Sequence, residues 1–100
     1  MKCMSPEAQS KLEQIFPQEQ WSAVIALLDS ECGSGLPLIG KQGAIGIERV
    51  QCAALKLSEG SMEKLGRAVQ VAKEDWRDVL VAAGFGHDVT AHREWLKEGL

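Results

Sequence analysis

The clearest chemical pattern in the chain is residues 35–41, Gly-Leu-Pro-Leu-Ile-Gly-Lys, which have the glycine and lysine spacing of a phosphate-binding loop. Such a loop binds phosphate through successive backbone N–H groups and a lysine ammonium, and a hydroxyl residue after the lysine binds magnesium. Here Gln42 follows the lysine, and Pro37 removes one N–H from the loop. We therefore interpret the segment as a glycine-rich connection and expect no nucleotide cofactor.

A second group of polar residues lies near the C-terminus and has the side chains of a metal site or an acid–base pair. It consists of His87, Asp88, His92 and Glu94. Asp88 and His92 can share a helical face, but His87 precedes the predicted helix, and metal sites use three or four ligands. A His–carboxylate pair is unspecific without a pocket. We interpret Asp88 as a helix cap and His92 as a surface or half-buried side chain.

The three cysteines, Cys3, Cys32 and Cys52, are odd in number and far apart in the sequence. This pattern is neither a disulfide framework nor a Cys-x-x-Cys motif. It is typical of free, mostly buried thiols in a reducing compartment. A catalytic thiol needs a base or a cation beside it, and the sequence places none there.

The charge pattern argues against a broad phosphate-binding surface, because 11 basic residues are scattered among 14 acidic ones and the net charge is −3. Residues 53–71 can still be interpreted as a helix-turn-helix with its recognition helix at 62–71. The outward side chains of that helix would be Glu63, Lys64, Arg67 and Gln70. A DNA-reading helix normally carries more positive charge, so a solvated amphipathic helix explains the same residues.

Length and composition predict a single globular domain over residues 1–100, with 45% apolar and 25% charged residues. The longest apolar runs, such as residues 23–28, are too short to cross a bilayer. The N-terminus has no apolar stretch of signal-peptide length. We expect a cytoplasmic protein without membrane association.

Ser5 and Pro6 predict the start of a first helix, as cap and first helical residue. The Phe16-Pro17 pair interrupts it, and a second helix then ends near Cys32. Both helices carry apolar residues at helical spacing. These are Ala8, Leu12, Ile15 and Phe16 in the first helix, and Trp21, Val24, Ile25 and Leu28 in the second.

Residues 33–46 contain five glycines and one proline and predict an irregular loop, followed by a third helix at about 47–57. The loop is too apolar for a flexible linker, so we expect it to lie on the core. If part of it is exposed, it is a candidate surface for a partner or a second copy of the chain. The side chains of this surface are Leu36, Leu38, Ile39 and Lys41.

After a turn at 58–61, in which Ser61 can cap the next helix, the apolar positions would suit one continuous helix over 62–83. Asp75 is nevertheless a good N-cap, so we favour two helices at about 62–73 and 76–83, with the unbroken helix as the alternative. The second of these is apolar nearly all round and is expected in the middle of the bundle.

Gly84 and Phe85 are expected to end the helix at 76–83, because glycine can adopt the left-handed conformation of a helix terminus. A last helix, capped by Asp88, carries Val89, Trp95 and Leu96. Trp21, Trp76 and Trp95 all fall on apolar helical faces and are expected in the core. The predicted fold is all-α, a compact bundle of five or six short helices with one glycine-rich loop.

Two segments resemble a family of small bacterial hypothetical proteins to which no activity is assigned. They are residues 55–60, Leu-Lys-Leu-Ser-Glu-Gly, and residues 72–85, Ala-Lys-Glu-Asp-Trp-Arg-Asp-Val-Leu-Val-Ala-Ala-Gly-Phe. The resemblance implies a bacterial cytoplasmic protein and supplies no catalytic residue.

The functional expectation is a small non-enzymatic helical module that acts through protein–protein contacts or self-association, with no catalytic, cofactor or metal-binding residue assigned. The alternative is a nucleic-acid-binding regulator that uses the helix-turn-helix-like segment at 53–71. An enzyme or small-ligand binder would instead need a deep pocket that holds Lys41, His87 or His92.

Overall fold

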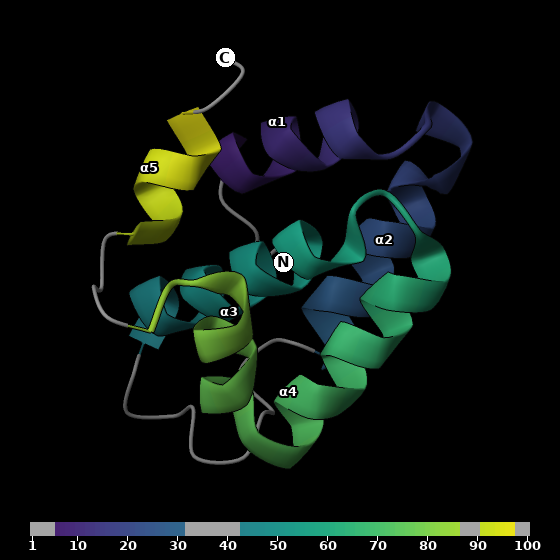
Figure 1. Ribbon diagram of the computed structural model, residues 1–100. Coiled ribbons are helices and arrows are strands. Elements are labelled where there is room, and N and C mark those ends of the chain that lie inside the picture. The colour runs from purple at the N-terminus through teal and green to yellow at the C-terminus, as the bar shows by residue number, and fades with distance from the viewer. Residues whose placement is uncertain (1–5, 32–42, 87–90, 98–100) are drawn as a thin grey trace.

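The helices are described in a computed structural model that covers residues 6–31, 43–86 and 91–97 (Figure 1). They are α1 (Pro6–Ile15), α2 (Gln18–Glu31), α3 (Gly43–Ser58), α4 (Met62–Ala83) and α5 (Ala91–Lys97). Over these residues there is no strand, and the predicted all-α bundle is confirmed. No helix in these ranges is long and apolar enough to span a membrane.

The predicted loop at 33–46 is wrong at its C-terminal end, because α3 begins at Gly43. Each glycine in a helix costs only about 1 kcal/mol relative to alanine, an amount that the extensive burial of α3 outweighs. The proposed partner surface of Leu36, Leu38, Ile39 and Lys41 lies outside the described residues.

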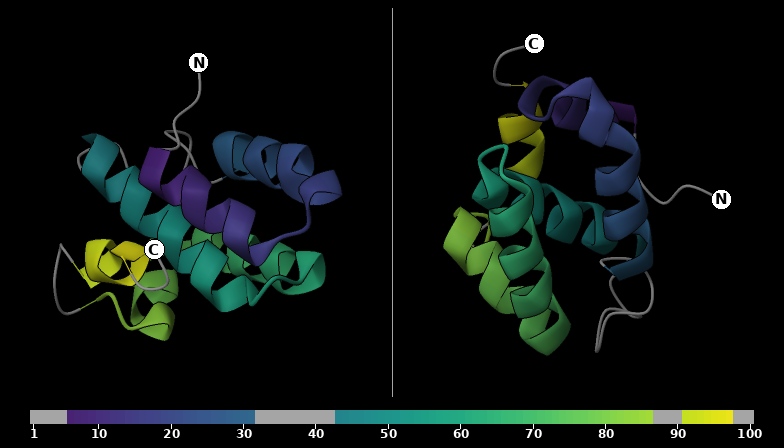
Figure 2. Two further views of the ribbon diagram at one scale, coloured as in Figure 1. Left: turned by 90° about the horizontal axis from the view of Figure 1, so that it is seen from above. Right: turned by 90° about the vertical axis from the view of Figure 1, so that its right-hand side faces the viewer.

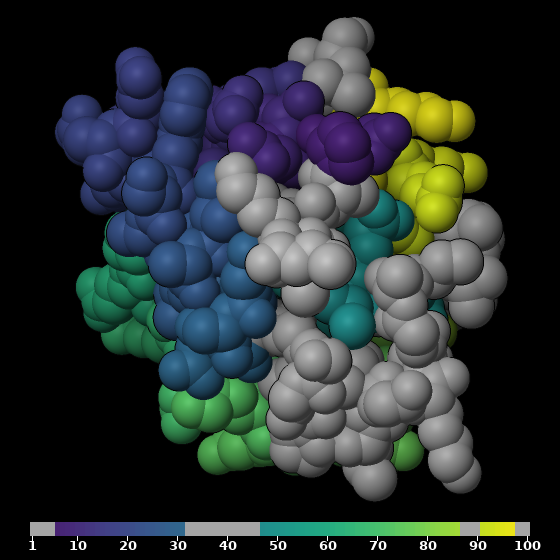
Figure 3. Space-filling view, turned by 180° about the vertical axis from the view of Figure 1, so that it is seen from behind, coloured from purple at the N-terminus to yellow at the C-terminus, as the bar shows by residue number. Residues whose placement is uncertain are grey.

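The central element of the bundle is α3, which contacts α1, α4 and α5. Six successive residues, 50–55, are buried, so this helix is covered on every side along that stretch. Seen from behind, only a small part of α3 is visible, below α1, with α2 to its left and α5 to its right (Figure 3).

The prediction that residues 76–83 lie in the middle of the bundle is wrong. This segment packs through one face, which carries Trp76, Val79 and Leu80, whereas the Val81 side chain is 71% exposed. The apolar residues of this segment therefore fall on two faces. One face packs into the core, and the other, which carries Val81, is exposed.

The predicted break in the helix at 62–83 is confirmed. Asp75 has φ −159° and ψ 105°, an extended conformation inside α4. Its Oδ1 accepts a hydrogen bond from the backbone N–H of Arg77 at 3.0 Å, which makes Asp75 the N-cap of the second half. The two halves of α4 form a V as a result (Figure 2).

The ends of α4 also follow the predicted signals. The Ser61 hydroxyl accepts a hydrogen bond from the backbone N–H of Lys64 at 3.3 Å, and Gly84 has the left-handed φ of 83°. The N–H of Phe85 donates to the Leu80 carbonyl oxygen at 2.8 Å and closes the last turn. The helix therefore begins and ends where local chemistry satisfies its free backbone groups.

The core combines the predicted apolar stripes with hydrogen bonds between helices. Buried residues from the first two helices are Ala8, Leu12, Phe16, Val24 and Leu28. Trp21 lies partly buried against them and donates from Nε1 to the Phe16 carbonyl oxygen at 2.8 Å, so it joins α2 to the end of α1. Gln51 of α3 donates to the Leu28 carbonyl oxygen at 3.3 Å near the end of α2.

Candidate docking groove

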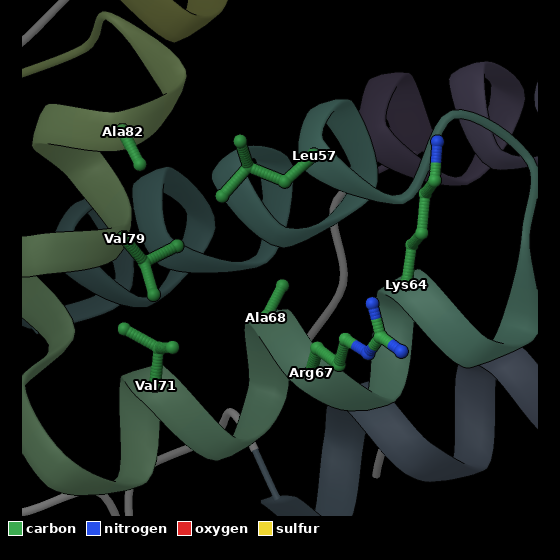
Figure 4. Close-up of a pocket in the computed structure, with 7 residues that line it drawn as sticks. All are labelled: Leu57, Lys64, Arg67, Ala68, Val71, Val79 and Ala82. Carbon is green, nitrogen blue, oxygen red and sulfur yellow. The ribbon is translucent and has the colours of Figure 1, made fainter.

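A groove of about 250 Å³ lies between the end of α3 and the two halves of α4 (Figure 4). Its lining residues are Leu57, Lys64, Arg67, Ala68, Val71, Val79 and Ala82. Val71 in the first half of α4 faces Val79 in the second half, and Leu57 of α3 closes the space between them. The groove exists because Asp75 turns the chain, since a straight helix would carry these two valines apart.

The floor of the groove is apolar. Ala68 and Val79 are buried, Leu57 is half-buried, and Ala82 is exposed. Val71 is 39% exposed. This floor offers aliphatic contacts to a ligand and no group that performs acid–base or nucleophilic chemistry.

The rim of the groove carries two cations, each paired with a neighbouring glutamate. Lys64 and Arg67 are the only charged residues that line it, and both come from the first half of α4. Lys64 Nζ lies 3.5 Å from Glu59 Oε1, and Arg67 Nη2 lies 2.6 Å from Glu63 Oε1. All four side chains are more than half exposed, so each pair contributes at most about 1 kcal/mol and is readily exchanged for another carboxylate.

The four outward residues of the predicted recognition helix, Glu63, Lys64, Arg67 and Gln70, are indeed exposed. Their charges are balanced, however, since Lys64 pairs with Glu59 and Arg67 pairs with Glu63. Farther along α4, Lys73 Nζ pairs with Glu31 Oε2 of α2 at 3.2 Å. Along this helix the described cations therefore alternate with acids and do not form a continuous basic face.

The prediction that His92 is a surface or half-buried side chain is wrong, because it is fully buried. His92 Nε2 lies 2.6 Å from Glu48 Oε1, a residue of α3 that is 44 positions away in the sequence. His87 and Asp88 lie outside the described residues, and Glu94 is exposed. Spacing along the chain gave no sign of the Glu48 partner, since only packing of α5 on α3 brings the two together.

A second pocket of about 230 Å³ lies beside this pair, where α1, α3 and α5 meet. It is lined by Glu7, Glu48, Arg93, Leu96 and Lys97. Two carboxylates and two cations share this small space, and Arg93 Nη2 lies 3.7 Å from Glu48 Oε1. These charges balance one another, so the pocket favours neither a cation nor an anion.

Cys52 of α3 is a free, fully buried thiol, as the cysteine pattern predicts. Burial raises its pKa strongly, and the negative charge of Glu48 adds to the effect. The thiol therefore stays protonated and has no access to a substrate. Cys3 and Cys32 lie outside the described residues.

Comparison of the chain with known protein families, curated proteins and solved structures finds no significant match.

Proposed function

We propose that this chain is a small, cytoplasmic, non-enzymatic helical module that acts by binding a protein segment in the groove between α3 and the two halves of α4. The observation that carries the proposal is the 39% exposure of Val71 inside an open, apolar groove. Exposed apolar surface that is concave and framed by polar side chains is typical of a protein-binding site.

The charges on the rim define the chemistry of the partner. Lys64 and Arg67 line the groove, whereas the glutamates that pair with them, Glu59 and Glu63, do not. A partner segment with one or two apolar side chains and a carboxylate about one helical turn away would fill the floor and pair with the rim. The volume of about 250 Å³ suits one or two such side chains and not a whole helix.

The chemistry of the groove supports a binding role over a catalytic one. Its lining consists of aliphatic side chains and two cations, without a serine, threonine, cysteine, histidine or carboxylate. General acid–base catalysis needs a group that exchanges protons near neutral pH within reach of the substrate. The odd number of cysteines and the protonated Cys52 thiol fit a reducing compartment.

A nuclear magnetic resonance titration with two designed peptides tests the proposal. Both peptides are amphipathic helices with the same leucine spacing, and their polar positions carry either glutamate or lysine. The acidic peptide should shift the amide signals of Ala68, Val71 and Ala82, and the basic peptide should not. Replacing Val71→Glu should abolish the shifts, whereas the neighbouring exposed change Gln70→Glu should leave them.

A short DNA duplex at low salt forms the third arm of the same titration. If neither peptide shifts the groove signals, the proposed binding role is wrong. If DNA instead shifts Lys64, Arg67 and Gln70 in a salt-dependent manner, the helix-turn-helix-like alternative is correct.

A further inference from the structure

The outer face of α4 carries an apolar side chain that the fold does not use. Among the described residues only two large apolar side chains are exposed by more than a third, and they are Val71 and Val81. Val71 belongs to the groove, whereas Val81 is 71% exposed and lies outside its lining. Val81 is therefore an apolar side chain outside the groove that remains open to a partner.

Val81 projects away from the groove of its own chain. Successive residues of a helix are separated by about 100°, so Val81 points about 160° from Val79 and about 100° from Ala82, the two residues of this half that line the groove. Groove and Val81 thus lie on different sides of the second half of α4. One copy of the chain can offer both at the same time.

A carboxylate accompanies Val81. Asp78 precedes it by three residues, so the two side chains are neighbours on one helical face. Asp78 is exposed and forms no ion pair with another described residue. The adjacent Arg77 is held by Asp75 through two side-chain hydrogen bonds of 3.0 Å. This face therefore presents an apolar side chain with an exposed acid one turn away, whose charge acts on Arg77.

We propose that a second copy of this chain inserts Val81 into the groove and pairs Asp78 with Lys64 or Arg67, an inference that rests on the proposed function of the groove. The two surfaces are complementary: the Val81 face carries an exposed apolar side chain and an exposed carboxylate, and the groove has an apolar floor with two cations on its rim. Asp78 displaces Glu59 or Glu63 from an exposed pair, an exchange that costs little.

The arrangement predicts head-to-tail contacts. Because the inserted face and the receiving groove are different surfaces, the contact is heterologous, and each added copy leaves one groove and one Val81 face open. Association therefore extends beyond the dimer into chains or a closed ring. One valine and one acid bury little surface, so assembly is weak and depends on protein concentration.

Sedimentation velocity of the full chain from about 10 μM to about 1 mM tests the inference over the range of a weak interface. The weight-average sedimentation coefficient of the wild type should rise steadily and pass the value of a dimer. Val81→Asp removes the inserted side chain, and Lys64→Glu with Arg67→Glu reverses the rim. Each of these variants should remain a monomer at every concentration, and the matched control Gln70→Glu should behave as the wild type.

Mixing the two variants gives the decisive result. The Val81→Asp chain keeps a working groove and the rim variant keeps a working Val81 face, so an equimolar mixture should form one-to-one pairs and nothing larger. Adding Asp78→Lys to the rim variant should restore assembly of that chain with itself. Circular dichroism of every variant should match the helical content of the wild type, which checks that the changes leave the fold intact.

A monomeric wild type throughout this range overturns the inference, and so does association that survives in both variants or stops at a symmetric dimer. None of these results contradicts the proposed function, which is tested separately by titrating the chain with the acidic and basic peptides at low protein concentration. Loss of peptide binding together with intact assembly would instead overturn the proposed function and the groove as the receiving surface.

Discussion

Lys56 of α3 donates a hydrogen bond from its ammonium to the carbonyl oxygen of Ala83, the last residue of α4, at 2.8 Å. The same ammonium lies 5.0 Å from the centre of the Phe85 ring. About two turns earlier on α3, Arg49 Nη2 donates to the Phe85 carbonyl oxygen at 2.9 Å. Two cations of the central helix thus hold the negative end of α4 and fix the second wall of the groove.

Replacing Lys56→Met should destabilise the fold by about 1 kcal/mol, because the methionine keeps the apolar stem and removes the charged donor from the end of α4. The free energy of unfolding from urea denaturation measures the loss. Lys64→Met is the matched control, since Lys64 makes only an exposed pair with Glu59, and its effect should stay below about 0.5 kcal/mol. Equal losses in the two variants would contradict the role of Lys56.

Replacing Gly60→Ala should destabilise the fold by more than about 1 kcal/mol. Gly60 has φ +83°, and an added Cβ would lie 2.9 Å from the carbonyl oxygen of Ile15. Gly66→Ala provides the opposite case, because nothing lies within 4 Å of its added Cβ in the interior of α4. That change should stabilise the chain by about 0.5 to 1 kcal/mol, and thermal melts of both variants should move in opposite directions.

Replacing Trp76→Ala should cost about 3 to 5 kcal/mol, the usual loss for a large core aromatic residue. Trp76 is 7% exposed and opens the second half of α4 directly after the break. The exposed Val81→Ala should change stability by less than about 0.5 kcal/mol. Chemical denaturation at a protein concentration low enough to exclude association compares the two, and a small effect at Trp76 would contradict its place in the core.

The charge of Asp75 should make the break in α4 depend on pH. Hydrogen bonds from the side chain and backbone of Arg77 lower the pKa of Asp75 below its ordinary value. A group whose pKa is lower in the folded chain stabilises that state above the pKa of the unfolded chain, about 3.9, and this contribution is lost as the pH falls through the lowered folded value.

Asp75→Asn isolates this contribution, because asparagine is also a good N-cap but carries no charge. The wild type should be the more stable of the two near neutral pH, and the difference should shrink as the pH falls below about 4. Urea midpoints at several pH values measure it. A difference that stays constant with pH would show that the charge of Asp75 contributes nothing.

Many of the positions where helices begin, break and end were predictable from the sequence, because capping acts within a single turn. Ser61 and Asp75 each bind backbone N–H groups two or three residues ahead, and Gly84 ends α4 through its own backbone conformation. The apolar stripes of the first two helices likewise need only the helical period. These features depend on residues only a few positions apart in the chain, and such residues can be read directly from the sequence.

Packing between helices, and no local pattern, establishes which helix is central and which side chains form a site. The sequence pattern favoured residues 76–83 for the middle, but α3 takes that place because it is covered by three other helices. His92 is buried because packing brings Glu48 to it across 44 residues.

The groove is the clearest case of this division. The sequence favoured a break at Asp75, through the capping chemistry of one aspartate, and the extended conformation of Asp75 confirms it. How far the two halves of α4 turn toward each other, and that Leu57 of α3 closes the space between Val71 and Val79, followed from the packing of elements distant in the chain. A local signal can tell where a helix bends, but the direction of the bend depends on what the rest of the molecule packs against it.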